Sequence, residues 1–338
     1  MSQPKVTVVI PTLTVGPSLL ECLASLAKQS RRDFDVIIVD NSGKGLVRQS
    51  EAGRLGATVL EAVENLGFGA ALNEGIRNSQ APYIATLNDD AIAHPGWLAA
   101  LIEAIEARQD VGSCASQVRL LGQDRLDSAG MLIAADGSSK QRGHGESPSK
   151  FPKLEEVLCP SGSAAIYRRK MVERVGLFDG DFFLYCEDTD LGLRAQWAGW
   201  KCLYVPEAVA EHEYSRTAGN ASPLKAYYVE RNRLMLAAKN FPVPELLKLP
   251  ASTLARYFWH SFEAITGHGS AGRFQSSGGG GVLQMGYIAA RAHLAAAWHL
   301  RRLWKKRRQI RYDARITPEQ FRQVLRKYSI TPRGVAAQ

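Results

Sequence analysis

Residues 83–90 read YIATLNDD, an apolar run that ends abruptly in one amide and two carboxylates. A buried strand that presents polar side chains at its carboxyl end is typical of the ligand-binding edge of an open α/β sheet. Adjacent carboxylates repel each other unless a positive charge lies between them. One interpretation of Asp89 and Asp90 is therefore a site for Mg²⁺ or Mn²⁺, which take oxygen ligands and are commonly shared with substrate phosphates. The other is a polar turn in which an aspartate caps the next helix.

Strand-like runs alternate with helical patterns along the first part of the chain. The runs cover residues 6–10, 34–39, 57–60 and 83–87, and a further run follows at 202–206. This alternation predicts an α/β fold with a doubly wound, mainly parallel sheet. Because parallel strands end at the same rim, we expect the polar residues after three of the strands to face one ligand. These strand ends are Pro11-Thr12, Asp40-Asn41-Ser42 and Asn88-Asp89-Asp90.

The segment 65–75, NLGFGAALNEG, is rich in glycine and leads into a helical pattern. It contains G-x-G at Gly67 and Gly69 but no third glycine at the spacing of a dinucleotide-binding fingerprint. We interpret its small residues as allowing the backbone to approach a phosphate or a ribose.

Length and composition indicate a well-buried core, in one large domain or two ordinary domains. The chain has 338 residues, of which 45% are hydrophobic and 22% charged, which is ordinary globular composition. Five widely spaced cysteines without a C-x-x-C pair indicate neither a disulfide framework nor a zinc site. Residues 1–5 run directly into a strand and leave no room for a signal-peptide apolar region. We therefore expect a cytoplasmic protein.

The net charge of +9 comes mainly from one segment. Seven of the eleven residues in 301–311 are basic and none is acidic, so the rest of the chain carries only about +2. The basicity is a local patch and not a property of the whole chain. No recognisable nucleic-acid-binding module surrounds the patch, so we expect no nucleic-acid partner.

Six ordered blocks together resemble glycosyltransferase family 2, an inverting family with the GT-A fold that includes many bacterial rhamnosyltransferases. The resemblance covers about residues 5–240. The blocks are VVIPT (8–12), VDNS (39–42), NLGFG (65–69, followed by Asn73 and Gly75), LNDD (87–90), CPSGSAAIYRR (159–169) and a run from VGLFD (175–179) to FFLYCEDTDLGLR (182–194).

The resemblance implies a nucleotide-sugar half at about residues 1–110 and an acceptor half at about 111–240. In the family the first two strand ends cradle the nucleobase and ribose, and a D-x-D motif holds the metal and diphosphate. The first position of that motif is Asn88 here, which leaves Asp90 as the most direct metal ligand. The implied donor-binding residues are Pro11, Thr12, Asp40, Ser42, Asn65, Gly67, Asn73, Asn88, Asp89 and Arg231. The implied acceptor-binding residues are Gly162, Ser163 and Trp200.

Glu187 and Asp188 follow the aromatic, apolar run 182–185. Such surroundings raise a carboxyl pKa towards the working pH, as a general base requires. The resemblance assigns the base to Asp188, with Glu187 positioning it or touching the acceptor. The alternative is that both are first-turn acids favoured by the helix dipole. For Asp190 we favour this structural role, with Arg194 four residues on as its partner.

His212 follows the last predicted strand. A lone histidine is often a structural hydrogen-bonding residue, yet imidazole also suits Mn²⁺. By family position it joins Asp90 and Asp89 as a metal ligand. Arg231 is expected in a helix, where it either holds diphosphate through two hydrogen bonds or forms an internal salt bridge.

Residues 241–338 form a helical, basic extension to the catalytic domain at 1–240. Two helical segments, 245–266 and 282–304, are rich in Ala, Leu and Trp, but polar residues interrupt the second too often for a transmembrane helix. An in-plane amphipathic helix with a polybasic end predicts binding to an anionic membrane surface. The alternative is a helical pair packed on the catalytic domain.

The sequence thus predicts a cytoplasmic, peripheral-membrane enzyme that uses Mg²⁺ or Mn²⁺ and a nucleoside-diphosphate sugar. The resemblance favours dTDP-L-rhamnose over UDP-sugars, with a glycan or polyprenyl-linked acceptor. A sugar nucleotidylyltransferase would need a basic loop after the first strand, which is absent from residues 11–16. A catalytically silent nucleotide-sugar-binding scaffold is the other alternative. The sequence leaves the linkage and any homo-oligomer open.

Overall fold

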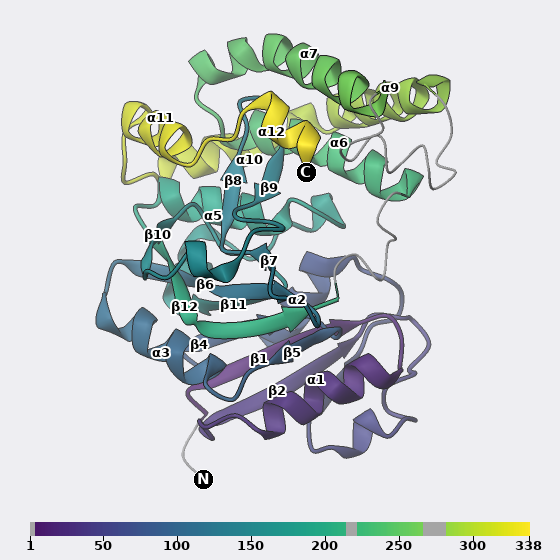
Figure 1. The fold of residues 1–338 in the computed structure, drawn as a ribbon, viewed down its shortest axis with the longest axis vertical. Coiled ribbons are helices and arrows are strands. Elements are labelled where there is room, and N and C mark those ends of the chain that lie inside the picture. Colours follow the sequence, from purple (N-terminus) through teal and green to yellow (C-terminus); the bar gives the residue numbers. More distant parts are fainter. Residues whose placement is uncertain (1–3, 214–221, 266–281) are drawn as a thin grey trace. The chain divides into compact units, whose positions relative to one another are not determined.

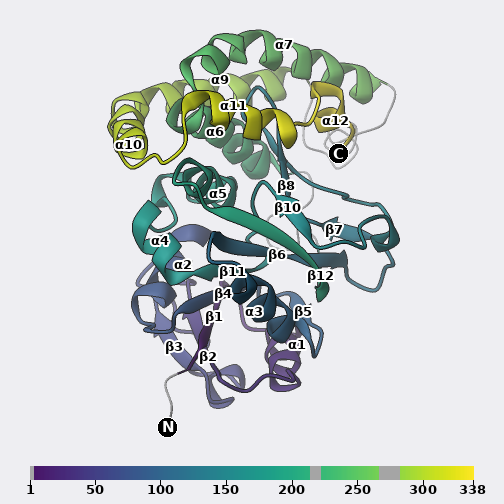
Figure 2. The ribbon, with the colours of Figure 1, turned by 90° about the vertical axis from the view of Figure 1, so that its left-hand side faces the viewer.

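The computed structural model describes residues 4–213, 222–265 and 282–338, and Figures 1 and 2 show the ribbon from two sides. The chain separates into two compact units. The first comprises residues 1–130, 141–195 and 200–214, and the second comprises 131–140, 196–199 and 215–338. This division differs from the boundary expected near residue 240, because residues 131–140 and the helix Pro223–Asn240 both belong to the second unit.

The first unit is built on one sheet, which has ten strands among the described residues. Its order is β10-β12-β6-β11-β4-β1-β2-β3, while β5 pairs with β12 and β7 pairs with β6. The strands are β1 Val6–Thr12, β2 Phe34–Asp40, β3 Thr58–Glu61, β4 Tyr83–Leu87, β5 Ala91–Ala93, β6 Val111–Leu120, β7 Leu126–Ser128, β10 Glu155–Val157, β11 Ala164–Arg168 and β12 Lys201–His212. The predicted α/β sheet is confirmed as a mixed sheet: β1, β2, β3, β4, β6 and β12 run in one direction. Strand β11 runs antiparallel between β4 and β6, and β5, β7 and β10 pair antiparallel with β12 or β6.

Helices cover both faces of this sheet, as Figures 1 and 2 show. Alternate strand residues point to opposite faces. Val8 and Ile10 therefore pack with α1 and α3, whereas Val9 packs with α2, α4 and α5. The helices are α1 Pro17–Ala27, α2 Phe68–Arg77, α3 Trp97–Ala107, α4 Arg169–Val175 and α5 Glu187–Trp197, with short 3₁₀ turns at Ala52–Arg54, Pro148–Lys150 and Gly180–Phe182. The predicted doubly wound arrangement is thus present.

The second unit is helical apart from the two-stranded sheet of β8 and β9. Its elements are β8 Met131–Ile133, β9 Ser139–Gln141, α6 Pro223–Asn240, α7 Val243–Ile265, α9 Val282–Trp298, α10 Leu300–Tyr312, α11 Pro318–Lys327 and α12 Pro332–Ala337. The segment predicted as one helix at 282–304 is divided at His299 into α9 and α10. No helix within the described residues is long and apolar enough to cross a membrane.

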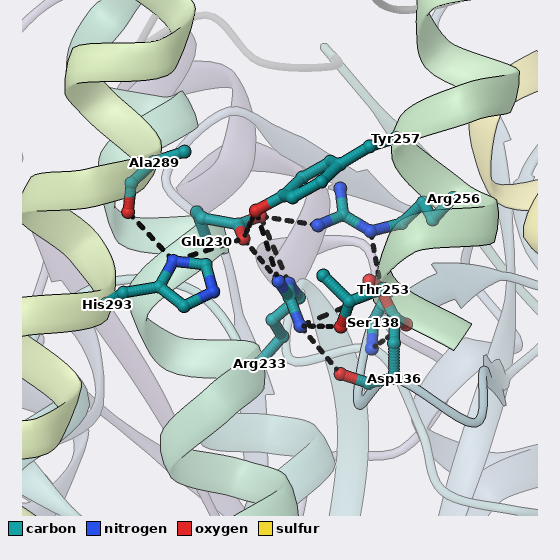
Figure 3. Close-up of polar contacts among 9 residues, drawn as sticks. All are labelled: Asp136, Ser138, Glu230, Arg233, Thr253, Arg256, Tyr257, Ala289 and His293. Atoms are coloured by element: carbon teal, nitrogen blue, oxygen red, sulfur yellow. Dashed lines mark hydrogen bonds and ion pairs between the residues drawn. The ribbon is translucent and has the colours of Figure 1, made fainter. Parts of the chain in front are cut away.

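Buried charges hold the second unit together around Glu230 of α6 (Figure 3). Its carboxylate accepts hydrogen bonds from Tyr257 Oη at 2.5 Å, from Arg256 Nη2 at 2.6 Å and from Arg233. Arg256 Nε also donates to Asp136 Oδ2 at 2.5 Å, in the turn between β8 and β9. Two carboxylates and two guanidinium groups thus compensate one another where water is excluded, and they tie α6, α7 and the hairpin together.

Candidate active site

Four strands bring polar residues to one edge of the sheet in the first unit. β1, β2 and β4 are parallel, and β12 runs in the same direction because β11 between β4 and β6 is antiparallel to both. Their carboxyl ends carry Thr12, Asp40, Asn88 and His212. The structure therefore brings together the three strand ends predicted to share a rim, and His212 joins them from the fourth.

The two adjacent carboxylates after β4 contact different strands. Thr12 Oγ1 donates a hydrogen bond to Asp89 Oδ2 at 2.5 Å, so Asp89 is held from β1. Asp90 is buried, and its Oδ1 lies 3.2 Å from His212 Nε2 at the end of β12. The Asn88 amide nitrogen lies 3.1 Å from the same Nε2. The predicted metal ligands Asp90 and His212 are therefore neighbours, with Asp89 beside them in the chain.

Asp127, which the sequence analysis did not single out, fixes the orientation of His212. This carboxylate of β7 is buried, and its Oδ2 lies 2.8 Å from His212 Nδ1. His144 Nδ1 lies 3.3 Å from the other oxygen. Burial alone would lower the pKa of His212, but its hydrogen bonds with Asp127 and Asp90 outweigh burial and raise that pKa to about 10. Burial alone would raise the pKa of Asp127, but hydrogen bonds from His144 and His212 outweigh burial and lower that pKa.

The arrangement of Asn88, Asp90 and His212 fits a divalent cation that takes some of its ligands from the protein and others from a diphosphate. Among the described residues, no set of three or more His, Cys, Asp or Glu side chains is arranged to hold a metal ion. Yet Asn88 Oδ1 is buried and, within the described part of the chain, has no hydrogen-bond partner, while Asp90 Oδ1 is buried at 3.2 Å from His212 Nε2. Mg²⁺ and Mn²⁺ use such oxygens together with substrate phosphates, and a carboxylate behind a ligating imidazole is a common outer-shell partner.

The predicted nucleotide-binding loops are held by bonds between their own members. Both Asp40 oxygens accept hydrogen bonds, Oδ1 from Ser42 Oγ at 2.6 Å and Oδ2 from Val47 N at 2.8 Å. Asn65 Oδ1 accepts from Gly67 N at 2.9 Å and from Asn41 Nδ2 at 3.1 Å. Buried Asn41 therefore links the end of β2 to the glycine-rich loop, and the loop's geometry is set before any ligand binds.

A Cβ added to either Gly67 or Gly69 would meet protein atoms, and the approach of a phosphate or ribose to the backbone of this loop stays a prediction. Gly67 has φ +84°, and a Cβ on it would lie 2.3 Å from the Phe183 carbonyl oxygen. A Cβ on Gly69 would lie 3.2 Å from Glu187 Cγ. Asn73, predicted to bind the donor, instead clamps the Phe178 backbone through hydrogen bonds of 2.8 and 3.0 Å. The motif thus lets α2 pack closely against the start of α5.

Asp188 stands in the first turn of α5 with its carboxylate held by backbone groups. Its Oδ2 accepts from Gly162 N at 3.0 Å and its Oδ1 from Thr189 N at 2.5 Å. Burial outweighs these bonds and raises the pKa of Asp188. Burial, with the neighbouring Asp188 charge, raises the pKa of buried Glu187 still further above its usual range. The pKa of both carboxyl groups is thus raised, that of Glu187 more than that of Asp188, and a raised pKa suits a general base.

Residues 162–163 join the Asp188 carboxylate to the strand end that carries Asp89 and Asp90. Gly162 N bonds Asp188, and the Ser163 carbonyl oxygen accepts from Asn88 N at 2.8 Å. Two of the three predicted acceptor-binding residues are therefore at this edge. The expected structural pair is also present, with Arg194 Nε 2.8 Å from Asp190 Oδ2.

One predicted site residue of the first unit, Trp200, is not brought to this edge. Trp200 immediately precedes β12, at the end of that strand opposite to His212, where it packs beside Gly112 and Met171. Arg231 lies on α6 in the second unit, where its Nε bonds Asn232 Oδ1 at 2.8 Å and its guanidinium lies over the Tyr228 ring. Trp200 was chosen by motif position, and motif position does not determine which end of a strand a residue occupies.

The fold is the GT-A architecture. The chain superposes on GalNAc-T7, solved with UDP, GalNAc and Mn²⁺, with a TM-score of 0.60 and 14% identity over 75% of this chain and 51% of the other. This chain thus spans about half of that structure. It superposes on the mannosyltransferase PcManGT of Pyrobaculum calidifontis, solved with GDP-Man and Mn²⁺, with a TM-score of 0.50 and 18% identity over 90% and 88% of the chains.

Sequence comparison identifies the family. The sequence model described as Glycosyl transferase family 2 matches residues 7–176, half of the chain, so the chain belongs to that family and is a glycosyltransferase. It is 30% identical over 247 residues to N-acetylglucosaminyl-diphospho-decaprenol L-rhamnosyltransferase of Mycobacterium tuberculosis, covering 65% of this chain and 80% of the relative. It is 27% identical to the uncharacterized glycosyltransferase YwdF of Bacillus subtilis, covering 64% and 77%. The predicted family resemblance is confirmed.

Proposed function

We propose that the enzyme transfers L-rhamnose from dTDP-L-rhamnose to a lipid-linked or cell-surface glycan, with inversion at the anomeric carbon and a divalent cation. The observation that carries the proposal is the link through residues 162–163. It holds the carboxylate of Asp188 beside the strand end that bears Asp89 and Asp90. A base and a diphosphate site are thereby joined by two hydrogen bonds, with the sugar between them.

The donor diphosphate is assigned to the edge formed by Asn88, Asp89, Asp90 and His212. Asp90 and His212 would hold Mg²⁺ or Mn²⁺, and the bound cation supplies positive charge against the charge that develops on the leaving diphosphate. Asp127 keeps the His212 ring oriented towards Asp90. Thr12 holds Asp89, and the loops at Asp40-Asn41-Ser42 and 65–67 lie where the nucleoside of the donor is expected.

Asp188 is assigned as the general base. Its ionised carboxylate accepts the proton of the acceptor hydroxyl as that oxygen attacks the anomeric carbon. The new glycosidic bond forms as the bond to the diphosphate breaks on the opposite face of the sugar, and the nucleoside diphosphate leaves with the electron pair. Glu187 is the neighbour of the base, and burial together with the Asp188 charge raises its pKa.

The choice of sugar and acceptor rests on the relative. Its name specifies L-rhamnosyl transfer to N-acetylglucosaminyl-diphospho-decaprenol. A polyprenyl-linked acceptor lies at a membrane, so we place the enzyme as a peripheral protein on the cytoplasmic face. A UDP-sugar-dependent transferase and a silent nucleotide-sugar-binding scaffold remain the alternatives to be tested.

Thermal unfolding with dTDP, UDP or GDP, each with and without Mn²⁺ or Mg²⁺, tests the donor site. A ligand at about 100 times its Kd that binds only the folded chain adds about 2.7 kcal/mol to the free energy of unfolding. We expect the largest metal-dependent shift with dTDP. A larger shift with UDP would select the UDP-sugar alternative, and no shift with any nucleotide would contradict the donor site.

Asp188→Asn separates catalysis from donor binding. Removal of a general base lowers the rate by about 10²–10⁴-fold, whereas the nucleotide-induced shift should be retained because Asp188 bonds Gly162 and Thr189 and not the proposed cation site. Transfer by this variant at the wild-type rate would refute the base assignment. Wild-type nucleotide binding without turnover on any polyprenyl-linked acceptor would support the scaffold.

A further inference from the structure

Helix α7 exposes its apolar side and buries polar groups. Inside the second unit, Arg256 and Tyr257 contact Glu230, and Thr253 Oγ1 accepts a hydrogen bond from Arg233 (Figure 3). The opposite side carries large apolar residues separated by three, four or seven positions, which places them on one stripe. The residues of this α7 stripe and their exposed fractions are Val243 56%, Leu247 78%, Leu254 68%, Phe258 63%, Phe262 47% and Ile265 86%.

Helix α9 carries a second exposed apolar stripe. Its members are spaced by four, seven and four residues, again along one side of a helix. They are Leu283 92%, Tyr287 66%, Leu294 74% and Trp298 88% exposed. α7 and α9 approach the same residue of α6, because Tyr257 Oη lies 2.5 Å and His293 Nδ1 3.9 Å from Glu230 Oε1. Both ribbon views draw the two helices next to each other (Figures 1 and 2).

Helix α10 adds positive charge and aromatic rings to these stripes. It follows α9 after His299, and its sequence LRRLWKKRRQIRY contains no acidic residue. Leu303, Arg307 and Ile310 face the interior, and Arg307 Nη1 donates to the Ala238 carbonyl of α6. The exposed residues are Leu300, Arg301, Arg302, Trp304, Lys305, Arg308, Gln309 and Tyr312.

The apolar stripes, the aromatic rings and the basic residues together indicate which kind of partner binds this surface. Exposed apolar stripes of this size indicate an interaction surface. Tryptophan and tyrosine beside basic residues are typical of the interface between lipid headgroups and acyl chains. A second copy of the chain would bring another positively charged α10 to the same surface, whereas an anionic bilayer has complementary charge.

The structure assigns the stripes of α7 and α9, with the exposed face of α10, as a docking surface for an anionic lipid bilayer. This assignment rests on the proposed lipid-linked acceptor and deepens it. It also adds α7 to the membrane-binding segment, which the sequence analysis placed at residues 282–304 and its basic end only. The apolar stripes enter the headgroup boundary, and the basic residues of α10 meet the lipid phosphates.

Co-sedimentation of the full-length protein with phosphatidylcholine vesicles, with and without phosphatidylglycerol, tests the surface. We expect binding to the mixed vesicles only, and its loss at about 1 M salt, where charges are screened within about 3 Å. Leu254→Ser and Phe258→Ser should each weaken partitioning about tenfold or more, as expected for an apolar side chain withdrawn from lipid. Val63→Ser is the matched control, because Val63 is 91% exposed in the first unit and should not affect binding.

Each outcome separates this proposal from its alternatives. The docking surface is contradicted if the wild type does not bind vesicles. It is also contradicted if the Leu254 and Phe258 variants bind vesicles as strongly as the wild type. A wild-type dimer in lipid-free sedimentation that either variant converts to a monomer also overturns it, in favour of a second copy. Loss of vesicle binding counts only if the variants keep the wild-type melting temperature. The nucleotide-induced shift is measured in parallel, because vesicle binding without that shift would refute the donor site alone, and the shift without vesicle binding would refute the docking surface alone.

Discussion

Asp127 illustrates how a residue without a motif can determine the geometry of a site. The predicted partners Asp90 and His212 lie in recognisable sequence blocks, whereas Asp127 is in the short strand β7 and reaches His212 only because β7 pairs with β6. Its nearest neighbours in the chain give no sign of this contact. A buried aspartate within 20 residues of a histidine, as with His144, is too common a pattern to indicate a ligand.

Asp127→Asn should weaken the binding of Mn²⁺. The amide retains the shape of the carboxylate but not its charge, so it no longer favours the His212 orientation and basicity that a ligand requires. Loss of such an outer-shell partner costs about 10–100-fold in metal affinity. Titration of Mn²⁺ in the presence of dTDP, followed by electron paramagnetic resonance of the free ion, measures this directly.

Asp110→Asn is the control, because Asp110 pairs with Arg108 at the protein surface. Equal Mn²⁺ affinities of the Asp127 variant and the wild type would show that His212 needs no support from β7. A lower melting temperature without a change in Mn²⁺ affinity would assign Asp127 a purely structural role.

The start of α5 is the element that depends most on close packing. Phe183, Tyr185 and Cys186 have φ values of 64°, 69° and 70°, in the left-handed region that costs such residues about 1–3 kcal/mol each. Phe68 N bonds the Phe183 carbonyl at 2.8 Å, and Gly67 leaves room for that carbonyl. The strained loop is thus held from α2, and it delivers Glu187 and Asp188 to the site.

Gly67→Ala should destabilise the protein more than Gly56→Ala. Both glycines have φ near +80°, so each alanine pays about 1–2 kcal/mol for the left-handed backbone. Gly56 has open space around it, whereas a Cβ on Gly67 meets the Phe183 carbonyl. Overpacking adds about 1–3 kcal/mol for Gly67 only. Urea unfolding of the two variants measures the difference, and equal losses would show that the α5 loop moves freely.

Element positions were largely predictable from the sequence, and their detailed roles were not. Apolar runs of five to seven residues between helical patterns are a local signal, so β1, β2 and β4 begin within a residue of the prediction. The packing role of Gly67 could not be predicted, because the atom that a Cβ there would meet belongs to Phe183, over a hundred residues away. Helix α7 likewise exposes apolar residues because its polar residues contact Glu230 and Asp136 in the interior. The periodicity of the sequence does not reveal these contacts.

At the scale of the whole molecule, buried ionisable groups make the stability of the second unit depend on pH. The second unit contains Glu230 with two arginines, and interactions with Arg256 and Arg233 outweigh burial and hold the pKa of Glu230 well below its usual range. Burial lowers the pKa of His260 on α7 to about 3. Both folded-state pKa values are depressed, so the unfolded chain takes up protons first as the pH falls. The stability of this unit is therefore lost from about pH 6.5 downwards through His260, and from about pH 4.3 through Glu230.

Glu230→Gln should lower the free energy of unfolding at pH 7. It should also make that free energy decrease less steeply as the pH falls below about 5. Removing one partner of a buried ion pair costs on the order of 3–5 kcal/mol, because Arg233 and Arg256 then lack their counter-charge. Glu74→Gln is the control, since Glu74 pairs with Arg77 at the surface and should change stability by less than about 0.5 kcal/mol. Denaturant unfolding at a series of pH values checks both, and an unchanged pH dependence in the Glu230 variant would contradict the role of its charge.

The unit boundaries could not be predicted because they follow contacts and not composition. Residues 131–140 sit between β7 and β10 in the sequence, yet they belong to the helical unit through Asp136 and its two arginines. The expected boundary at residue 240 followed the change in amino-acid composition after α6. Composition indicates which residues prefer to be buried, but it does not indicate in which of the two units a segment is buried.

The pairing of β5 with β12 has a consequence for synthesis of the chain. His212 pairs with Ala91, so the strand that completes the edge beside Asp90 is made about 120 residues after its partner. At about 5–20 residues per second, a ribosome needs roughly 6–24 seconds to cover that distance. From the completion of β6 at residue 120 until β12 is made, β6 lacks its β12 neighbour and presents an open edge on which other chains can pair. The exposure of this edge favours aggregation of the nascent chain until residue 212 has emerged.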